Sequence, residues 1–129
     1  MTFYKRAVLI NILTELYPHG VSIACGTTYA SIILHYNTEP LVPEQTIIDL
    51  YPSYVQKYNL EILRQQRQIR LTSTDYCGLA DYPFPNAETK QAWLTYRQEL
   101  RTITDRYLNP EVDENDNLIG VTWPVKPSA

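Results

Sequence analysis

The feature that most constrains this fold is a stripe of large apolar side chains in the last third of the chain. Trp93, Tyr96, Leu100, Ile103 and Tyr107 follow one another at intervals of three, four, three and four residues. Side chains at this spacing share one face of an α-helix. The stripe therefore predicts a helix that buries this face, with Trp93, Leu100 and Ile103 inside the core of the chain's own domain.

The residues before the stripe predict where that helix begins. The side-chain oxygen of Asn86 can accept hydrogen bonds from the backbone N–H groups of a first helical turn, and Glu88 would place a negative charge at the positive end of the helix. Pro83 and Pro85 lie too close together for a helix to run through them. We therefore expect residues 79–85 to form an ordered, extended connector.

The N-terminal part of the chain predicts a helix and a β-hairpin. Leucines recur at intervals of four and three within residues 3–17, which indicates a helix that Pro18 and Gly20 would end. Residues 21–25 and 29–36 are rich in β-branched and aromatic side chains with partial alternation. We expect these two segments to pair as an antiparallel hairpin.

The middle of the chain predicts one or two helices, depending on a proline. Pro43 is well placed at the first turn of a helix. Pro52 then stands where this helix would otherwise continue. Either residues 43–50 form a short helix and residues 53–71 a second one, or a single helix is kinked at Pro52.

Charge gives little reason to expect a nucleic-acid or membrane partner. The net charge is −3 with a pI near 5.3, and no apolar run approaches the roughly 20 residues of a membrane-spanning helix. Arg64, Arg67 and Arg70 repeat every third residue and could follow phosphates, but three cations on one helix are more often a solvated face. We expect a soluble protein without an export signal; a small nucleic-acid-binding regulator using these arginines is the third hypothesis for the chain.

No pattern of residues indicates catalysis, a metal or a cofactor. His19 and His35 have no nucleophile motif near them, and the four glycines lack the spacing of a phosphate-binding loop. Cys25 and Cys77 lack the paired spacing of zinc ligands and fit reduced thiols better than a disulfide. Residues 113–124 imitate the first ligands of a calcium loop but lack its glycine and its glutamate, which favours a polar turn. We expect a protein that is not an enzyme and holds no cofactor.

These elements together predict a small α+β protein. The expected order is an N-terminal helix, a β-hairpin, two or three further helices and a short C-terminal extended arm or hairpin. We expect residues 1–129 to form a single domain. Within it, residues 1–42 would be a leader of helix plus hairpin, and residues 43–129 a helical region with the C-terminal arm.

Large residues at fixed spacing in the second half of the chain match a known pattern. A Thr-Asp-aromatic helix end precedes a loop with Leu and Asp, a Lys-x-x-Trp-x-x-Tyr-Arg helix continues into Leu-Arg-x-Ile, and a Trp-Pro follows. The matching residues are Thr74, Asp75, Tyr76, Leu79, Asp81, Lys90, Trp93, Tyr96, Arg97, Leu100, Arg101, Ile103, Trp123 and Pro124. In these residues the chain resembles the phage tail assembly chaperone family, with Tyr76 in place of the usual tryptophan. Residues 1–42, with the Leu-Tyr-Pro turn at residues 16–18, resemble more loosely the leaders of other phage proteins.

The resemblance implies a non-catalytic chaperone in residues 43–129. Such a protein would bind a phage tail fibre or receptor-binding protein and assist its folding and trimerisation in the host cytoplasm. The alternative is a structural virion subunit of the fibre or baseplate that stays bound and is retained in the virion tail; homo-oligomerisation is left open. Tyr, Trp and Arg are enriched at contact hot spots. The implied partner-binding residues are Tyr96, Arg97, Arg101, Trp93, Asp75, Tyr76, Asp81 and Trp123, of which Tyr96, Arg97 and Arg101 are expected on the surface.

Overall fold

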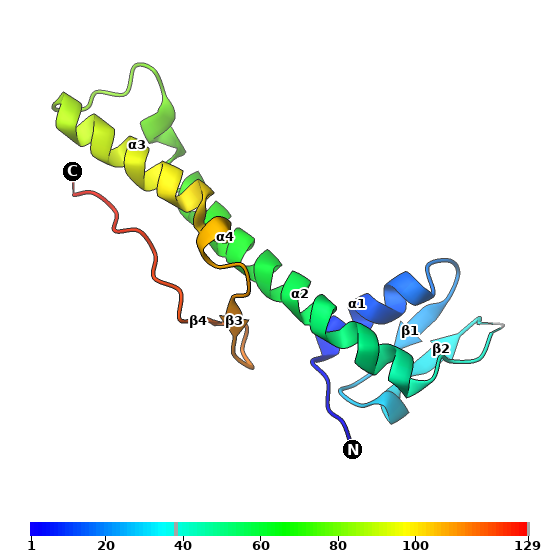
Figure 1. Ribbon diagram of the computed structural model, residues 1–129. Helices are drawn as coiled ribbons and strands as arrows, with labels where there is room; N and C mark the ends of the chain where they lie inside the picture. The colour runs from blue at the N-terminus through cyan, green and yellow to red at the C-terminus, as the bar shows by residue number, and fades with distance from the viewer. Residues whose placement is uncertain (38, 129) are drawn as a thin grey trace. The chain divides into compact units, whose positions relative to one another are not determined.

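The computed structural model describes residues 1–37 and 39–128, and the chain divides into two compact units, Met1–Tyr58 and Asn59–Ala129. Helices and two small hairpins make it an α+β protein, as the sequence predicts (Figure 1). The elements in chain order are α1 (Arg6–Leu16), β1 (Ser22–Ala24), the 3₁₀ helix η1 (Tyr29–Ser31), β2 (Ile33–His35), α2 (Glu44–Thr72), the 3₁₀ helix η2 (Asp75–Gly78), α3 (Ala87–Arg101), α4 (Ile103–Arg106), β3 (Glu111–Val112) and β4 (Leu118–Ile119).

The core of the first unit is built on α1. Val8, Leu9, Ile12 and Leu13 are fully buried, and their spacing places them on one face of the helix. Ile47, near the start of α2, belongs to the same apolar cluster. The periodicity that predicted this helix is therefore the periodicity of its buried face.

The β-hairpin of the first unit has short strands. β1 pairs antiparallel with β2, with Ile23 opposite Leu34 at the centre of the register. Tyr29–Ser31, which was expected to be part of the second strand, instead forms η1. The hydroxyl of Ser31 accepts a hydrogen bond from the Gly26 backbone N–H at 2.8 Å, which stabilises this turn. The expected hairpin is confirmed, but its second strand is shorter than the sequence indicates.

Tyrosine hydroxyls make long-range links within the first unit. Tyr4 donates to a Glu44 carboxylate oxygen at 2.8 Å, and the Lys5 backbone N–H donates to the Tyr51 hydroxyl at 2.8 Å. The rings of Tyr4 and Tyr51 meet edge to face with 5.1 Å between centroids. Tyr17, at the end of α1, accepts from the Val42 backbone N–H at 2.9 Å. These hydroxyls find partners at the edge of an apolar core, where tyrosine can bury its ring and keep its polar group bonded.

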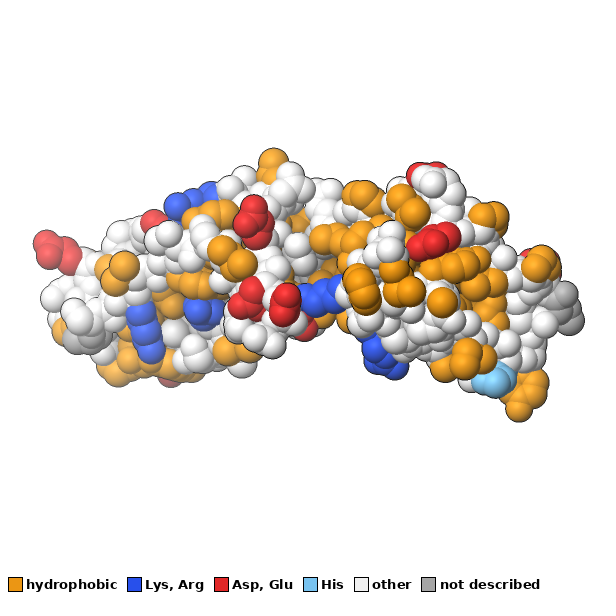
Figure 2. All heavy atoms as spheres, turned by 90° about the horizontal axis from the view of Figure 1, so that it is seen from below, with side chains coloured by type: hydrophobic (Ala, Val, Ile, Leu, Met, Phe, Trp, Pro, Cys, Tyr) orange, Lys and Arg blue, Asp and Glu red, His pale blue; other side chains and the backbone are white. Residues whose placement is uncertain are grey.

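Some apolar side chains of the first unit stay at the surface. Phe3, Ile33 and Tyr36 are 69%, 51% and 88% exposed. On the face shown in Figure 2, many hydrophobic side chains (orange) lie near a histidine (pale blue), and both histidines of the chain belong to this unit.

α2 is one continuous helix with Pro52 inside it. Proline lacks the N–H that would bond to the carbonyl four residues earlier, so one helical hydrogen bond is missing there. Of the two arrangements that the sequence allows, the structure has the single helix. Its residues up to Tyr58 belong to the first unit, and those from Asn59 onward belong to the second.

The second unit contains an aromatic core. Leu71, Cys77, Trp93, Tyr96 and Leu100 form a buried cluster, against which two partly buried aromatic side chains pack, those of Phe84 and Trp123. Before α3, the Asn86 side chain accepts a hydrogen bond from the Thr89 backbone N–H at 2.8 Å. The predicted helix start is therefore confirmed.

The end of the chain contains both structures that the sequence allowed. β3 and β4 form a small hairpin around a polar turn, in which Asp113 Oδ1 accepts from the backbone N–H groups of Asn115 at 2.8 Å and Asn117 at 2.9 Å. Residues 121–128, called the C-terminal arm below, follow without helix or strand. In Figure 1 the arm (red) runs beside α3 (yellow).

Candidate partner-binding site

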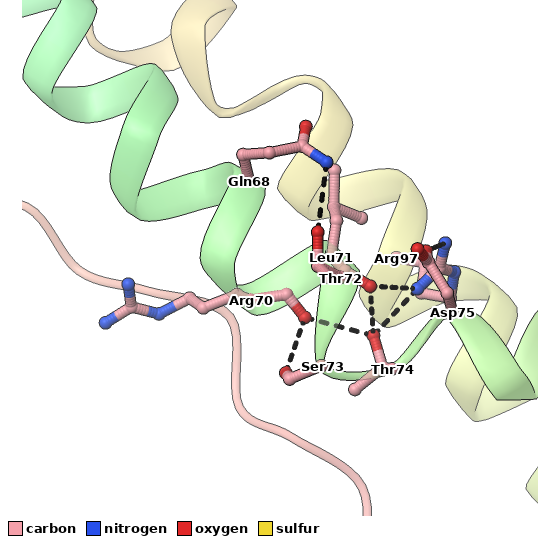
Figure 3. A network of polar contacts seen from close by, with 8 residues as sticks. All are labelled: Gln68, Arg70, Leu71, Thr72, Ser73, Thr74, Asp75 and Arg97. Atoms are coloured by element: carbon pink, nitrogen blue, oxygen red, sulfur yellow. Dashed lines mark hydrogen bonds and ion pairs between the residues drawn. The ribbon is translucent and has the colours of Figure 1, made fainter.

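Arg97 of α3 closes the carboxyl-terminal end of α2 (Figure 3). Its Nη1 donates to the Leu71 carbonyl oxygen at 2.8 Å and to Thr74 Oγ1 at 2.7 Å. Its Nη2 forms an ion pair with Asp75 Oδ1 at 2.8 Å. Carbonyl groups in the last turn of a helix lack intrahelical donors, and a cation is favoured at this negative end of the helix dipole. Arg97 supplies both a donor and a charge there.

Thr74 connects this arginine with the last turn of α2. The side chain is fully buried, and its hydroxyl lies 3.1 Å from the Arg70 carbonyl oxygen and 3.3 Å from that of Leu71. A hydroxyl has one hydrogen and two lone pairs, so it can donate to one of these carbonyls while accepting from Arg97. Hydrogen bonds from Arg97 and Thr74 thus satisfy the polar groups at the buried end of α2.

Burial separates the expected contact residues into two groups. Trp93, Tyr96 and Arg97 are only 5%, 6% and 7% exposed. The expectation that Tyr96 and Arg97 lie on the surface is wrong, because Tyr96 packs in the aromatic core and Arg97 is held by the end of α2. The expectation that Trp93, Leu100 and Ile103 lie inside is confirmed.

The other expected contact residues are more accessible. Tyr76 is 44% exposed, the Asp75 side chain is 62% exposed, and Asp81 and Arg101 are also exposed. Asp75 is brought to Arg97, whereas the Asp81 side chain has no hydrogen bond or ion pair within residues 1–37 and 39–128. Tyr76, Asp81 and Arg101 therefore remain available for a partner, whereas Asp75 is paired with Arg97.

Trp123 packs the C-terminal arm against α2. The guanidinium carbon of Arg70 lies 3.8 Å from the centroid of the Trp123 ring, and this contact is a cation–π interaction. Just before it, the Thr122 backbone N–H donates to the Tyr107 hydroxyl at 3.0 Å. This hydrogen bond lowers the pKa of Tyr107, because it favours the ionised oxygen.

The three regularly spaced arginines of α2 do not form one free cationic face. Arg67 Nη1 donates to the Arg101 carbonyl oxygen at 3.2 Å, and Arg70 stacks on Trp123. Arg64 lies 3.8 Å from a Glu61 carboxylate oxygen. Two of the three arginines therefore hold parts of the second unit together, which weakens the hypothesis of a phosphate-binding row.

An open groove of about 990 Å³ lies between α3 and the end of the C-terminal arm. The helix contributes mainly polar and small side chains, and the arm contributes the other wall. The lining residues are Glu88, Gln91, Ala92, Thr95, Tyr96 and Glu99 from α3, and Val125, Lys126, Pro127 and Ser128 from the arm.

Sequence reasoning missed this groove. Its helical wall has a periodic signal, because Glu88, Ala92, Thr95 and Glu99 follow at intervals of four, three and four residues. This spacing defines a second face of α3 beside the aromatic stripe. The pattern could have been found in the sequence, but its opposite wall is an irregular segment that periodicity does not place.

The described residues contain neither a metal-ligand cluster nor a membrane-spanning helix. Within residues 1–37 and 39–128 there is no group of three or more His, Cys, Asp or Glu side chains arranged to hold a metal ion. In the same part of the chain, no helix combines the length and apolarity needed to cross a membrane.

Comparison with known families identifies the second half of the chain. The model of the family described as phage tail assembly chaperone protein matches residues 60–128. The chain belongs to the phage tail assembly chaperone family. This match nearly coincides with the second compact unit, Asn59–Ala129. Neither the curated proteins nor the solved structures gave a match to the chain.

In this tail assembly chaperone, some motif residues are buried inside the second unit and others lie at its surface. Trp93, Tyr96 and Arg97 hold the unit together, and Asp75 completes the Arg97 network from the surface. Most of the motif residues that resemble the family therefore make contacts inside the second unit. The chain's role in tail assembly depends on this unit being folded. The surface that meets another protein has to lie outside this buried set.

Proposed function

We propose that this protein is a tail-fibre assembly chaperone. It binds a tail fibre or receptor-binding protein and assists its folding and trimerisation by contact alone, without catalysis. It acts in the host cytoplasm while the tail is assembled, and it needs neither nucleic acid nor a membrane for this work.

The observation that carries the proposal is the coincidence of the family match with a compact unit that exposes apolar side chains. Leu79, Leu94 and Val125 of this unit are 60%, 42% and 88% exposed. Exposed apolar groups can cover apolar segments of an incompletely folded partner and so keep those segments from aggregating. A binder of this kind shifts folding by mass action and needs no bound nucleotide.

The loop before α3 adds an aromatic surface to this unit. The rings of Tyr76 and Tyr82 have centroids 5.3 Å apart, and those of Tyr82 and Phe84 are 4.6 Å apart. Tyrosine at a surface offers apolar contact area together with a hydroxyl that can bond to a partner. We assign partner contact to Tyr76, Asp81 and Arg101, and a supporting role to Trp93, Tyr96, Arg97 and Trp123.

Co-expression tests the proposal directly. The tail-fibre protein of the same phage is produced with and without this chain, and its soluble trimer is measured by size-exclusion chromatography with light scattering. We expect the chain to raise the yield of soluble trimer severalfold and to co-purify with the fibre. An equal yield of trimer in both cultures would contradict the proposal.

Mass spectrometry of purified virions shows whether the protein stays on the fibre after assembly. A chaperone that dissociates from the finished fibre should be present only in trace amounts relative to the fibre protein. Copies in fixed proportion to the fibre would instead indicate a structural subunit that stays in the virion tail.

A further inference from the structure

The groove between α3 and the C-terminal arm has features of a binding site for an extended chain. One wall is the face of α3 that carries Ala92 and Thr95, and the other is the arm itself. Val125, on the arm, is 88% exposed although it is apolar and lines the groove. An apolar side chain in this position gains contacts only when something enters the groove.

The backbone of the arm is available for pairing. Within the described residues, the backbone groups of residues 123–128 make no hydrogen bond to the rest of the chain. Pro124 and Pro127 lack an N–H, so the donors that remain are those of the residues between and beside them. An extended segment can add to such an open edge as a strand, with main-chain hydrogen bonds providing part of the affinity.

The helical wall of the groove is negatively charged at both ends. Glu88 and Glu99 line the groove eleven residues apart on α3, a separation of about 16 Å at the helical rise. Neither carboxylate forms an ion pair within residues 1–37 and 39–128. Lys126 lines the opposite wall, and its Nζ lies 5.8 Å from the centroid of the Trp93 ring. The two carboxylates are therefore free to meet cations on a ligand.

We propose that this groove holds an extended segment of the tail-fibre partner, with an apolar side chain against Ala92 and Val125 and basic side chains toward Glu88 and Glu99. The separation of the carboxylates corresponds to basic residues about four to six positions apart in an extended segment, at an even interval so that both side chains lie on the same face. This inference rests on the proposed function and adds the location and chemistry of the contact. The arm then acts as the second wall of the site.

The test compares two exposed apolar positions in complexes with the co-expressed tail-fibre protein. Val125→Asp puts a charge into the groove, and Ile69→Asp is the matched control, because Ile69 is 62% exposed on α2 and does not line the groove. Both variants should keep the thermal midpoint of the wild-type chain. We expect Val125→Asp to lower the fibre recovered per chaperone by about tenfold, and Ile69→Asp to lower it by less than about twofold.

A second pair of variants tests the charges. Glu88→Gln with Glu99→Gln removes both carboxylates of the groove, and Glu111→Gln with Glu114→Gln removes two exposed carboxylates elsewhere in the second unit. We expect only the first double variant to weaken fibre binding and to reduce its dependence on salt concentration, since fewer ion pairs form.

The outcomes separate this inference from the proposed function. If the wild-type chain recovers no fibre, the proposed function fails and the inference fails with it. If the wild-type chain recovers fibre and Val125→Asp recovers as much as Ile69→Asp, the groove assignment is overturned while the chaperone role stands. Light scattering that shows a wild-type dimer converted to a monomer by Val125→Asp would assign the groove to a second copy and would also overturn the inference.

Discussion

Arg97 illustrates how a residue type common at contact surfaces can complete a fold instead. Its guanidinium serves two acceptors at the end of α2 and one carboxylate, while only 7% of the residue is exposed. A planar group with five donors suits such a converging set of oxygens better than the single ammonium of lysine. The cost of removing Arg97 should therefore come mainly from the buried Leu71 and Thr74 oxygens, each of which loses a donor.

Variants at Arg97 and Asp75 should distinguish the contribution of the buried hydrogen bonds from that of the exposed ion pair. We expect Arg97→Ala to lower the free energy of unfolding by about 2 to 4 kcal/mol, because it leaves the buried Thr74 hydroxyl oxygen without its donor, removes one of the donors to the Leu71 carbonyl and opens a cavity. Asp75→Asn should cost less than about 1 kcal/mol, since the Asp75 side chain is 62% exposed and its ion pair is screened by water. Chemical denaturation measures both changes. Equal losses in the two variants would show that the ion pair, rather than the buried network, dominates.

Tyr4 should give the first unit a dependence on alkaline pH. Burial and then the hydrogen bond to Glu44 raise the pKa of Tyr4 to about 12, from 10.0 in an unperturbed tyrosine. The stabilising effect is fully present below pH 10 and is lost as the pH rises toward 12, because the unfolded chain releases this proton more readily than the folded one. Denaturation midpoints measured across this range should fall less steeply in Tyr4→Phe than in the wild-type chain.

The control for this measurement is Tyr36→Phe, at a side chain that is 88% exposed. This variant should keep the alkaline slope of the wild-type chain. If Tyr4→Phe kept the same slope as well, another group would be responsible for the loss of stability.

At the scale of elements, the sequence predicted those segments whose structure follows from local periodicity and capping. The leucines of α1 and the aromatic stripe of α3 lie on buried faces, and Asn86 caps α3 as its position indicates. Local patterns could not decide whether α2 would continue through Pro52, because tertiary packing can offset one missing hydrogen bond.

The candidate site was less predictable than the helices. The burial of Arg97 depends on oxygens of Leu71 and Thr74, which lie more than twenty residues earlier in the chain. Periodicity also cannot show that an irregular arm carrying Val125 returns to α3 to form a groove. Both features depend on long-range contacts, and a single sequence carries no local signal for such contacts.

The Asn86 cap provides a prediction for α3. Asn86→Ala removes the acceptor for the Thr89 N–H and should lower the free energy of unfolding of the second unit by about 1 kcal/mol. Asn86→Asp should retain most of that stability, because aspartate accepts the same hydrogen bond and adds a negative charge at the helix start. Thermal melts followed by circular dichroism measure the difference. Equal loss in both variants would mean that the cap hydrogen bond does not contribute.

At the scale of the whole molecule, the described residues form two hydrophobic clusters that share no buried residue. One surrounds α1, and the other surrounds the aromatic stripe of α3. The family match covers residues 60–128, so the first cluster lies outside it. The first unit thus has a core of its own outside the matched region.

Hydrogen exchange should show the separation of the two cores. We expect Leu13→Ala to cost about 2 to 5 kcal/mol and to reduce the protection of amides in α1 and the β1–β2 hairpin. Leu100→Ala should reduce protection in α3 by a similar amount. Both leucines are fully buried, so the two variants are matched. Loss of protection throughout the chain in either variant would show that it unfolds as one cooperative body.

The closure of α2 by Arg97 also has a consequence for synthesis on the ribosome. A nascent chain that has emerged only as far as Thr74 contains all of α2, but the guanidinium that binds the Leu71 carbonyl in its last turn has not yet been made. The last turn should fray until translation reaches α3. Truncated chains that stop before Arg97 should therefore be preferred targets for host proteases, whereas finished chains should resist cleavage at that position.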